Sequence, residues 1–441
     1  MEFIDRALDR CKRLGADMAD VYNITHESLT ISVRDGEVEL IKKAAPGGMA
    51  IRFYAGGKAA FAHSTNLSDS AIDNIVPKLP KLADKTERDE FAVLAESQDY
   101  RNDLDLFDAS RSGEPMEAKI EYLKDLEKLA LKFDPIITKS NGVSYEELLT
   151  TKSLGNSNGV RLTFKTTLYR VGVSVVAAKG DEMYPGEGSL FARHFSDLPS
   201  REKIVERFAS KAVRMIGGTP VEGGDYEIIF RPRAAWSILW GLNYALNGSY
   251  SFKGASFLAG KKDQAIAAEN FSVHDDPLKL RGVASRPADD EGVASVKNVL
   301  VENGILRGFM YDLKTAAKAK AASTGSSRRE EYSSYPEISP SNFYIAGGKD
   351  NLDDVIASCK KGIIVEDTQG WGLHSVTGQY SAGINGTLVE NGKRVRPVAG
   401  VTIAAGAEEL LMGIGAICGD IEFYDNFSSP SLMVKRMKVG V

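Results

Sequence analysis

Cysteine and histidine are scarce in this chain of 441 residues, which contains three cysteines and five histidines. The cysteines are odd in number and far apart in the sequence, so they form neither a disulfide framework nor a paired-cysteine metal motif. A helical zinc site takes two histidines from one helix face, with a glutamate beside them. No two of the histidines are that close in the sequence, since they stand at His26, His63, His194, His274 and His374.

An excess of positive charge and long apolar runs are also missing. Lysine and arginine total 55 against 60 aspartates and glutamates. Such a chain has no basic field that would hold a phosphate backbone, so we expect no direct binding of nucleic acid. No apolar run approaches the roughly 20 residues that span a bilayer, and Met1–Lys12 lacks the apolar stretch of a secretory signal. We therefore expect a cytoplasmic protein without a membrane partner.

Signatures of nucleotide binding and of serine hydrolases are absent as well. The sequence contains no GxxxxGK[ST] phosphate loop and no GxSxG nucleophile elbow. Its paired glycines stand in isolated turns, where backbone freedom explains them.

What is present is local periodicity of two kinds. Apolar residues between Ile4 and Leu14 recur at helical spacing, which makes Cys11 a core residue. Alternating apolar residues flank three dipeptides typical of tight hairpin turns, namely Asp35-Gly36, Asn303-Gly304 and Asn391-Gly392. Further helices are expected at 68–82, 116–130, 201–215, 234–246, 311–322 and 407–417. Because the strands come in antiparallel groups and the helices are not regularly interleaved, the fold class is α+β.

Two segments divide the chain. Residues 85–114 are highly charged and show little periodicity, and residues 217–224 are rich in glycine. They predict an N-terminal mixed α/β domain with antiparallel hairpins over 1–86 and a central α+β region over 114–217. A β-rich C-terminal domain with antiparallel sheets and a few helices is predicted over 225–441.

Two acidic clusters and one pair of residues are candidates for chemistry. His274-Asp275-Asp276 and Asp289-Asp290-Glu291 carry oxygens that suit a divalent cation, but exposed turns of this composition are common and are the favoured interpretation. Cys418 and His374 are the candidates for a nucleophile and its base. A structural cysteine and a surface histidine are favoured over such a dyad.

Several segments of strand and turn residues follow one another in a fixed order along nearly the whole chain. They span residues 28–39, 48–52, 61–66, 289–293, 301–306, 323–325, 339–342, 347–348, 377–381 and 390–392. In sequence and order they resemble the TldD/PmbA family, whose members are sometimes labelled modulators of DNA gyrase. Each segment alone is weak, but so many in one order are hard to reach by chance.

The resemblance implies a zinc site in catalytic relatives that this chain lacks. Those relatives carry an HExxxH motif on a helix early in the C-terminal domain, with a cysteine near the C-terminus as a further ligand. Aligned on the leucine and glycine that follow the motif, this sequence has Leu239, Trp240 and Tyr244 in place of the three motif residues. None of them is a suitable zinc ligand. Cys418 falls in the region of the family's cysteine.

These departures are typical of the PmbA, or TldE, side of the family. The resemblance then implies no cofactor in this chain, with zinc held by a TldD-type catalytic subunit, and unfolded or small peptides as substrates. An extended peptide would add to a sheet edge through backbone hydrogen bonds. Ser323–Tyr335 is a candidate loop near such a groove, although an exposed connection is the favoured interpretation.

Two other interpretations stay open. One is a stand-alone peptide-binding or scaffold protein that forms a homodimer and does not catalyse a reaction. The other is an independent cysteine hydrolase that uses Cys418 and His374. A constellation around Asp289, Asp290 and His374 would be a further route to activity.

Overall fold

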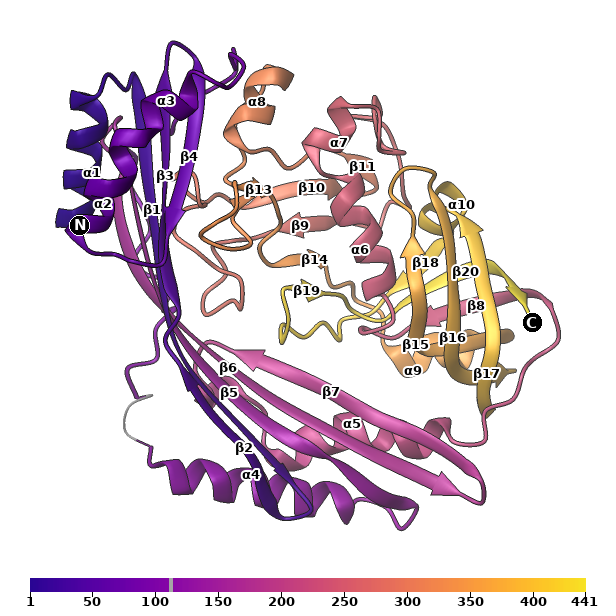
Figure 1. The fold of residues 1–441 in the computed structure, drawn as a ribbon. Helices are drawn as coiled ribbons and strands as arrows, with labels where there is room; N and C mark the ends of the chain where they lie inside the picture. The colour runs from indigo at the N-terminus through magenta and orange to yellow at the C-terminus, as the bar shows by residue number, and fades with distance from the viewer. Residues whose placement is uncertain (111–113) are drawn as a thin grey trace.

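A long curved sheet forms one side of the molecule in the computed structural model, which describes residues 1–110 and 114–441 (Figure 1). Its strands follow the order β4-β3-β1-β5-β6-β7, with β2 paired to β1. They are β1 Met18–Arg34, β2 Glu37–Ala44, β3 Gly47–Ala55, β4 Lys58–Ser64, β5 Ile137–Asn156, β6 Arg161–Lys179 and β7 Glu182–Ala192.

Strands from the first and the central segments of the chain pair in this one sheet. On one side, β1 pairs with β3 over Met18–Thr25 and with β2 over Ser28–Arg34. On its other side it pairs with β5 over Asp20–Val33. The charged segment between residues 85 and 114 therefore separates two parts of one continuous sheet.

Helices cover this sheet at its two ends. The first cover consists of α1 Glu2–Arg13, α2 Asp69–Ile75, the short η1 Val76–Lys78 and α3 Leu79–Ala83. Cys11 is fully buried beneath it, as predicted. The second cover consists of α4 Met116–Leu131 and α5 Arg201–Met215, after the short η3 Phe195–Asp197, and they bury apolar residues of β5, β6 and β7. Figure 1 shows the two covers at opposite ends of the long strands.

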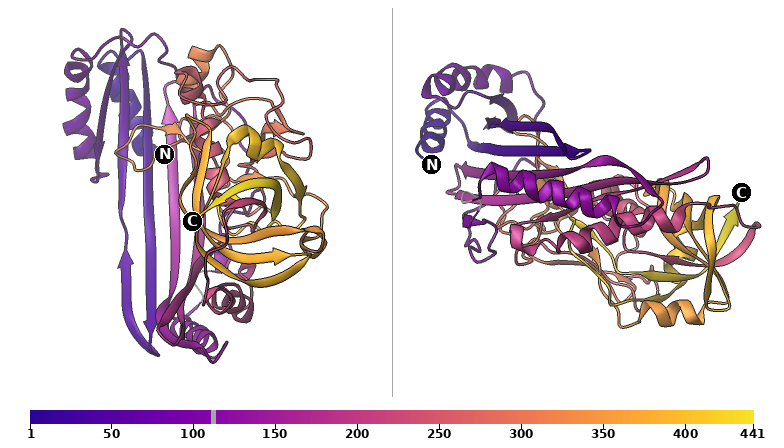
Figure 2. Two further views of the ribbon diagram at one scale, coloured as in Figure 1. Left: turned by 90° about the vertical axis from the view of Figure 1, so that its right-hand side faces the viewer. Right: turned by 90° about the horizontal axis from the view of Figure 1, so that it is seen from below.

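The remaining residues form a second layer beside the long sheet (Figure 2). A six-stranded sheet has the order β17-β16-β15-β8-β20-β18, and a five-stranded sheet has the order β11-β10-β9-β14-β19. Their strands are β8 Gly224–Phe230, β9 Val273–Asp275, β10 Asn298–Glu302, β11 Ile305–Leu306, β14 Phe343–Ile345, β15 Lys361–Leu373, β16 Gln379–Glu390, β17 Lys393–Gly406, β18 Ile414–Ile417, β19 Phe427–Ser428 and β20 Leu432–Gly440. A two-stranded ribbon, β12 Ser327–Arg328 with β13 Glu337–Ile338, stands apart.

Short helices pack against these sheets. They are α6 Trp236–Ala245, α7 Gly248–Phe252, α8 Leu313–Ala319, α9 Leu352–Ser358 and α10 Ala407–Met412. Of these, α6 contacts β14, β15 and β19 and lies at the centre of the largest apolar core. Among residues 1–110 and 114–441, no helix combines the length and the apolar character needed to cross a membrane.

The predicted α+β class is confirmed, and so are the hairpins at Asp35-Gly36, Asn303-Gly304 and Asn391-Gly392. The helix predicted over 407–417 is wrong in its second half, because α10 ends at Met412 and residues 414–417 form β18. Pairing with β20 overrides the local helical spacing there. The helix predicted over 311–322 is also shorter, because Asp312 caps its start and accepts a hydrogen bond from Thr315 N.

Candidate functional site

Helix α6 carries a row of aromatic side chains. Trp236, Trp240 and Tyr244 recur at four-residue spacing, which places them on one helix face. The two indoles stack with ring centroids 5.0 Å apart, and the ring of Tyr244 meets that of Trp240 at 5.2 Å. Gly241 faces the other way and lets the backbone of β15 approach, since a Cβ there would lie 2.0 Å from Leu373 O. We call these three residues the aromatic row.

Three positions on α6 align with the zinc motif of catalytic relatives, and none of them offers a ligand of the kind that zinc prefers. Leu239 is 1% exposed and packs in the core, on the buried face of the helix. The indole of Trp240 has only a donor N–H. Burial raises the pKa of Tyr244, so its phenol stays protonated near neutral pH. Within the part of the chain that the structure describes, no three His, Cys, Asp or Glu side chains gather into a metal site.

Cys418 and His374 lie in different surroundings. Cys418 is 1% exposed and packs with Ile229, Ile364 and α9, on the face of the six-stranded sheet opposite to α6. Burial, then the nearby carboxylates of Asp420 and Asp350, raises the pKa of its thiol to about 11. His374 stands in an exposed turn, where its Nδ1 lies 3.1 Å from Thr377 Oγ1. The structure thus places the buried thiol and the exposed imidazole in separate surroundings and does not bring them together as a dyad.

A cavity of about 820 Å³ lies where the edge of the long sheet faces the second layer. Its walls include Glu187–Phe191 of β7 on one side and Arg233, Trp236, Tyr424 and Phe427 on the other. We call it the sheet-edge groove. Trp236 thereby brings one end of the aromatic row into the groove.

The backbone of β7 faces this groove, because β7 is an edge strand of its sheet. Phe191 N donates to Tyr424 O at 3.1 Å, outside the sheet. Strand alternation then directs the N–H and C=O of Ser189 and Glu187 to the same side. Glu187 O already accepts from Arg233 Nη1 at 3.0 Å. Further along, Pro185 has no N–H to donate, so the outward-facing ladder is short.

A second cavity, of about 600 Å³, adjoins the first and shares Phe191 and Asp425 with it. Five cationic side chains belong to its lining, and they come from separate parts of the sequence. They are Lys152, Arg193, Arg286, Arg328 and Arg329. We call it the basic cavity. Sequence reasoning missed these residues because no local motif joins them; the nearest signal was the segment Ser323–Tyr335.

The segment Ser323–Tyr335 is only partly the exposed connection that the sequence favours, because Arg328 and Glu330 are exposed but its middle is buried. Ser326 and Ser327 are fully buried and Arg329 is 3% exposed. The expectation failed because the small and polar residues of the segment bond to buried carboxylates elsewhere in the chain. Ser327 N and Arg329 N donate to Asp289 Oδ2 and Asp290 Oδ2, at 3.1 and 2.8 Å.

The acidic cluster at Asp289 is likewise buried, which corrects the expectation of an exposed turn. Oδ1 of Asp289 accepts from Glu291 N and Val293 N, at 3.0 and 2.9 Å. Burial, and then the charge of Glu291, raises the pKa of Asp289 to about 7. The carboxylate therefore organises its own turn instead of facing solvent.

Asp290 and Glu291 join the two layers. Asp290 Oδ1 accepts from Lys152 Nζ of β5 at 2.9 Å, and Glu291 Oε1 lies 3.5 Å from Arg52 Nη1 of β3. Burial is the largest influence on Asp290 and alone would raise its pKa, but the charge of Lys152 and the hydrogen bonds from Arg329 N and Lys152 Nζ together lower it. Burial raises the pKa of Glu291 despite the opposing charge of Arg52. These carboxyls serve the packing of the two layers.

The other acidic cluster also departs from its prediction as an exposed turn. Residues Val273–Asp275 form β9, and Asp275 is fully buried. Its Oδ1 accepts from both Ser341 N and Ser341 Oγ at 2.6 Å. The turn interpretation failed because pairing with β10 and β14 draws the segment into a sheet.

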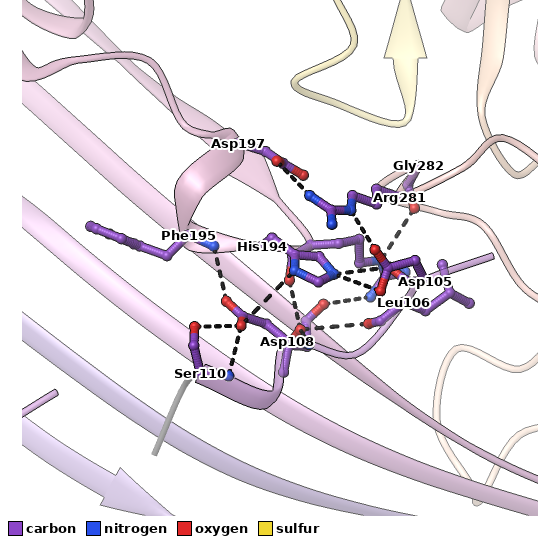
Figure 3. Close-up of polar contacts among 11 residues, drawn as sticks. Asp105, Leu106, Asp108, Ser110, His194, Phe195, Asp197, Arg281 and Gly282 are labelled. Carbon is purple, nitrogen blue, oxygen red and sulfur yellow. Dashed lines mark hydrogen bonds and ion pairs between the residues drawn. The ribbon is translucent and has the colours of Figure 1, made fainter. Parts of the chain in front are cut away.

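Polar contacts among Asp105, His194, Asp197 and Arg281 connect the residues that follow β7 with the segment that leads to Arg286 (Figure 3). Arg281 donates to Asp105 Oδ2 at 2.6 Å and to Asp197 Oδ1 at 2.9 Å. His194 Nε2 lies 3.0 Å from Asp105 O, and since a carbonyl can only accept, this nitrogen carries a proton. The network thus joins three distant segments next to Arg193 and Val283, which line the basic cavity.

Comparison with known proteins covers nearly all of the chain. Residues 19–83, 112–216 and 223–441 match, in order, the first, central and C-terminal domains of the PmbA/TldA metallopeptidases. The chain is 28% identical to a metalloprotease PmbA homolog of Haemophilus influenzae, over 98% of this chain and 94% of that protein. It is 27% identical to the metalloprotease PmbA of Escherichia coli O157:H7, over 96% and 92%.

The fold has a close match among solved structures. The crystal structure of TldE from Thermococcus kodakarensis superposes with a TM-score of 0.89 at 23% identity, and the match covers 100% of each chain. The order of motifs in the sequence, the two-layered fold and these matches agree with one another. The chain therefore belongs to the PmbA/TldD family of metallopeptidases.

Proposed function

We propose that this chain is a TldE-type subunit of a two-subunit metallopeptidase complex in the cytoplasm, and that a TldD-type partner supplies the zinc. The observation that carries the proposal is the chemistry of α6, where an aliphatic side chain, an indole and a phenol stand at the aligned motif positions. These residues do not fit zinc, because Leu239 lies in the core and burial keeps the Tyr244 phenol protonated. The chain contributes peptide binding, and the hydrolytic step belongs to its partner.

Cys418 does not restore a site on this helix. Its thiol packs on the other face of the six-stranded sheet, and burial holds its pKa at about 11. The same observations weigh against an independent cysteine hydrolase. Residual zinc affinity at α6 would need a deprotonated or lone-pair donor that these residues lack.

The sheet-edge groove is the proposed place for an unfolded or small peptide. An extended peptide laid along β7 would pair with the outward N–H and C=O groups of Ser189 and Glu187. Backbone pairing gives affinity with little sequence preference. Trp236, at the groove wall, would contact alternate side chains of such a peptide.

Metal analysis of the purified chain, alone and with a TldD-type subunit, tests the proposal. We expect no stoichiometric zinc and no peptide cleavage from the chain alone, and both from the complex. A partner whose motif glutamate is changed to glutamine serves as the control, because it keeps the assembly and removes the general base. About one tightly bound zinc per chain in the isolated protein would overturn the proposal, as would cleavage without a partner.

Peptide binding is tested separately with backbone-methylated peptides. Methylation of alternate residues on the strand-facing side removes the donors that pair with β7, so affinity should fall. Methylation of the intervening residues should leave affinity unchanged. Equal affinities for the two methylated series would refute binding along the sheet edge. Sedimentation of the chain with and without its partner distinguishes this complex from a stand-alone homodimer.

A further inference from the structure

The basic cavity holds more positive charge than its own carboxylates neutralise. Among residues 1–110 and 114–441, no carboxylate forms an ion pair with Arg193, Arg286 or Arg328. The acidic side chains in the lining are Glu330, Glu331 and Asp425, and all three are exposed. The lining is therefore cationic inside and acidic at its rim, while Asp275, Asp289 and Asp290, which lie outside the lining, offset part of the charge of Arg286.

Arg193 is the clearest case of a cation held without a counter-ion. It is 8% exposed, and its Nε and Nη1 donate to Gly282 O at 3.2 Å and Thr167 O at 3.0 Å. Burial, then the charge of Arg328, lowers its pKa to about 10, which still leaves the guanidinium charged at neutral pH. Backbone carbonyls fix its position but do not neutralise it. An arriving anion would remove the cost of burying an unpaired charge.

Arg286 and Arg329 add donors that the surrounding residues leave unused. Arg286 is 7% exposed and Arg329 is 3% exposed. Nε of each has no hydrogen-bond partner in the described part of the chain. The contacts of Arg286 to the carbonyls of Gly325 and Ser339, at 3.3 and 3.5 Å, are long. Small movements would turn these guanidinium groups toward an anion.

Two further side chains at the cavity, Lys152 and His26, also suit an anion. Lys152 brings a half-buried ammonium to the cavity, where Asp290 Oδ1 already accepts a hydrogen bond from it at 2.9 Å. His26 lies 2.9 Å from Thr150 Oγ1 through Nδ1, and burial followed by the charge of Lys152 lowers its pKa. A neutral imidazole that accepts at Nδ1 presents a donor N–H at Nε2.

The cavity lies within reach of a peptide in the sheet-edge groove. Phe191 and Asp425 line both cavities, so the two cavities adjoin each other at these residues. An extended chain advances about 3.3 Å per residue. A few residues beyond the end of β7 would therefore carry a peptide end, or a side chain, into the basic cavity.

We propose that the basic cavity binds a carboxylate of the peptide held in the sheet-edge groove. The carboxylate comes from the peptide C-terminus or from an aspartate or glutamate side chain. This inference rests on the proposed peptide-binding function and names its substrate class, peptides that carry a negative charge near one end. Guanidinium groups suit this ligand because their planar N–H donors match the two oxygens of a carboxylate.

Fluorescence anisotropy with three labelled peptides of one backbone sequence tests the proposal. The first has a free C-terminus and only neutral side chains, the second is its C-terminal amide, and the third is an amide with one glutamate. We expect the amide without a glutamate to bind about tenfold more weakly than at least one carboxylate peptide. Whichever carboxylate peptide is preferred identifies the source of the anion.

Arg328→Gln and Arg394→Gln form a matched pair of variants. Both remove one exposed positive charge. Arg328 lines the cavity, whereas Arg394 of β17 pairs with Asp353 of α9 and lines neither cavity. Circular dichroism checks that both variants fold. We expect Arg328→Gln to reduce the preference for the carboxylate peptide several-fold and Arg394→Gln to preserve it.

Three results would overturn the inference: equal affinity for all three peptides, no binding by any of them, or equal effects of the two variants. The last would mean that net charge alone steers the peptide. None of these measurements needs zinc or a partner. A chain that selects carboxylate peptides yet binds zinc would therefore refute the proposed function and leave this inference standing.

Discussion

Replacing Asp289 with asparagine should make the free energy of unfolding less sensitive to pH. Folding raises the pKa of this carboxyl from an ordinary 3.8 to about 7, because burial and the charge of Glu291 disfavour the ionised form. The native state therefore binds this proton more tightly than the unfolded chain does. The stabilisation is fully present below pH 3.8 and is lost as the pH rises through about 7.

The magnitude follows from the size of the pKa shift. A gap of about three pH units, at about 1.4 kcal/mol for each unit, corresponds to about 4 kcal/mol. The Asp289→Asn variant loses hydrogen bonds that the carboxylate accepts, including that from Ser327 N. We treat the stability lost with these hydrogen bonds as the same at every pH. The stability of the variant minus that of the wild type should therefore rise by about 4 kcal/mol between pH 4 and pH 8.

Urea unfolding followed by tryptophan fluorescence provides the assay. Trp236, Trp240 and Trp371 all lie in the same half of the chain as Asp289, so the signal reports on the relevant layer. Asp353→Asn is the control, since the side chain of Asp353 is 80% exposed, and it should show no such slope. A difference between Asp289→Asn and wild type that stays constant within about 1 kcal/mol across this range would refute the argument.

Three further predictions follow from burial and close packing. Arg52→Met should lower the free energy of unfolding by about 3 to 5 kcal/mol in urea titrations, because it removes the cation of Glu291 and leaves Asp20 with the more distant Arg329, at 3.9 Å. A change below about 1 kcal/mol would contradict this. Gly241→Ala should cost about 1 to 3 kcal/mol by the same assay, since its Cβ would meet a backbone oxygen. Gly406→Ala is its control, because a Cβ there meets no atom within 4 Å. Burial raises the pKa of every cysteine thiol, so Ellman's reagent at pH 8 should find none reactive in the native protein and all three in denaturant. These pKa values are about 12 for Cys11 and Cys359 and about 11 for Cys418.

The features predicted correctly from sequence are those that neighbouring residues determine. Asp35, Asn303 and Asn391 all have a positive φ, of 53°, 49° and 51°, and each precedes a glycine in a two-residue turn. Such dipeptides favour the hairpin whatever surrounds them. Likewise, the helical spacing of Ile4, Ala7 and Leu8 predicts the buried face of α1.

The features that were missed depend on distant partners. The segment at 414–417 becomes a strand because β20, near the C-terminus, pairs with it. Asp289-Asp290-Glu291 looks like an exposed turn in isolation, yet Arg52 and Lys152 lie far away in the sequence and draw it into the interior. Local composition carries no information about such partners. The division into three domains stays a prediction, since one sheet continues through the first two of them.

The candidate site shows the same division between local and distant information. The identity of the residues on α6 is visible in the sequence, so the proposal that a partner supplies the zinc could be made without a structure. The basic cavity is assembled from separate segments and has no sequence signature of its own. The segment from Glu422 to Ser429 connects the two features, because Phe427 meets the ring of Trp240 at 5.9 Å and Asp425 lines both cavities. A peptide that fills one cavity must therefore press on a wall shared with the other, so apolar contact at the aromatic row and carboxylate binding in the basic cavity should be energetically coupled.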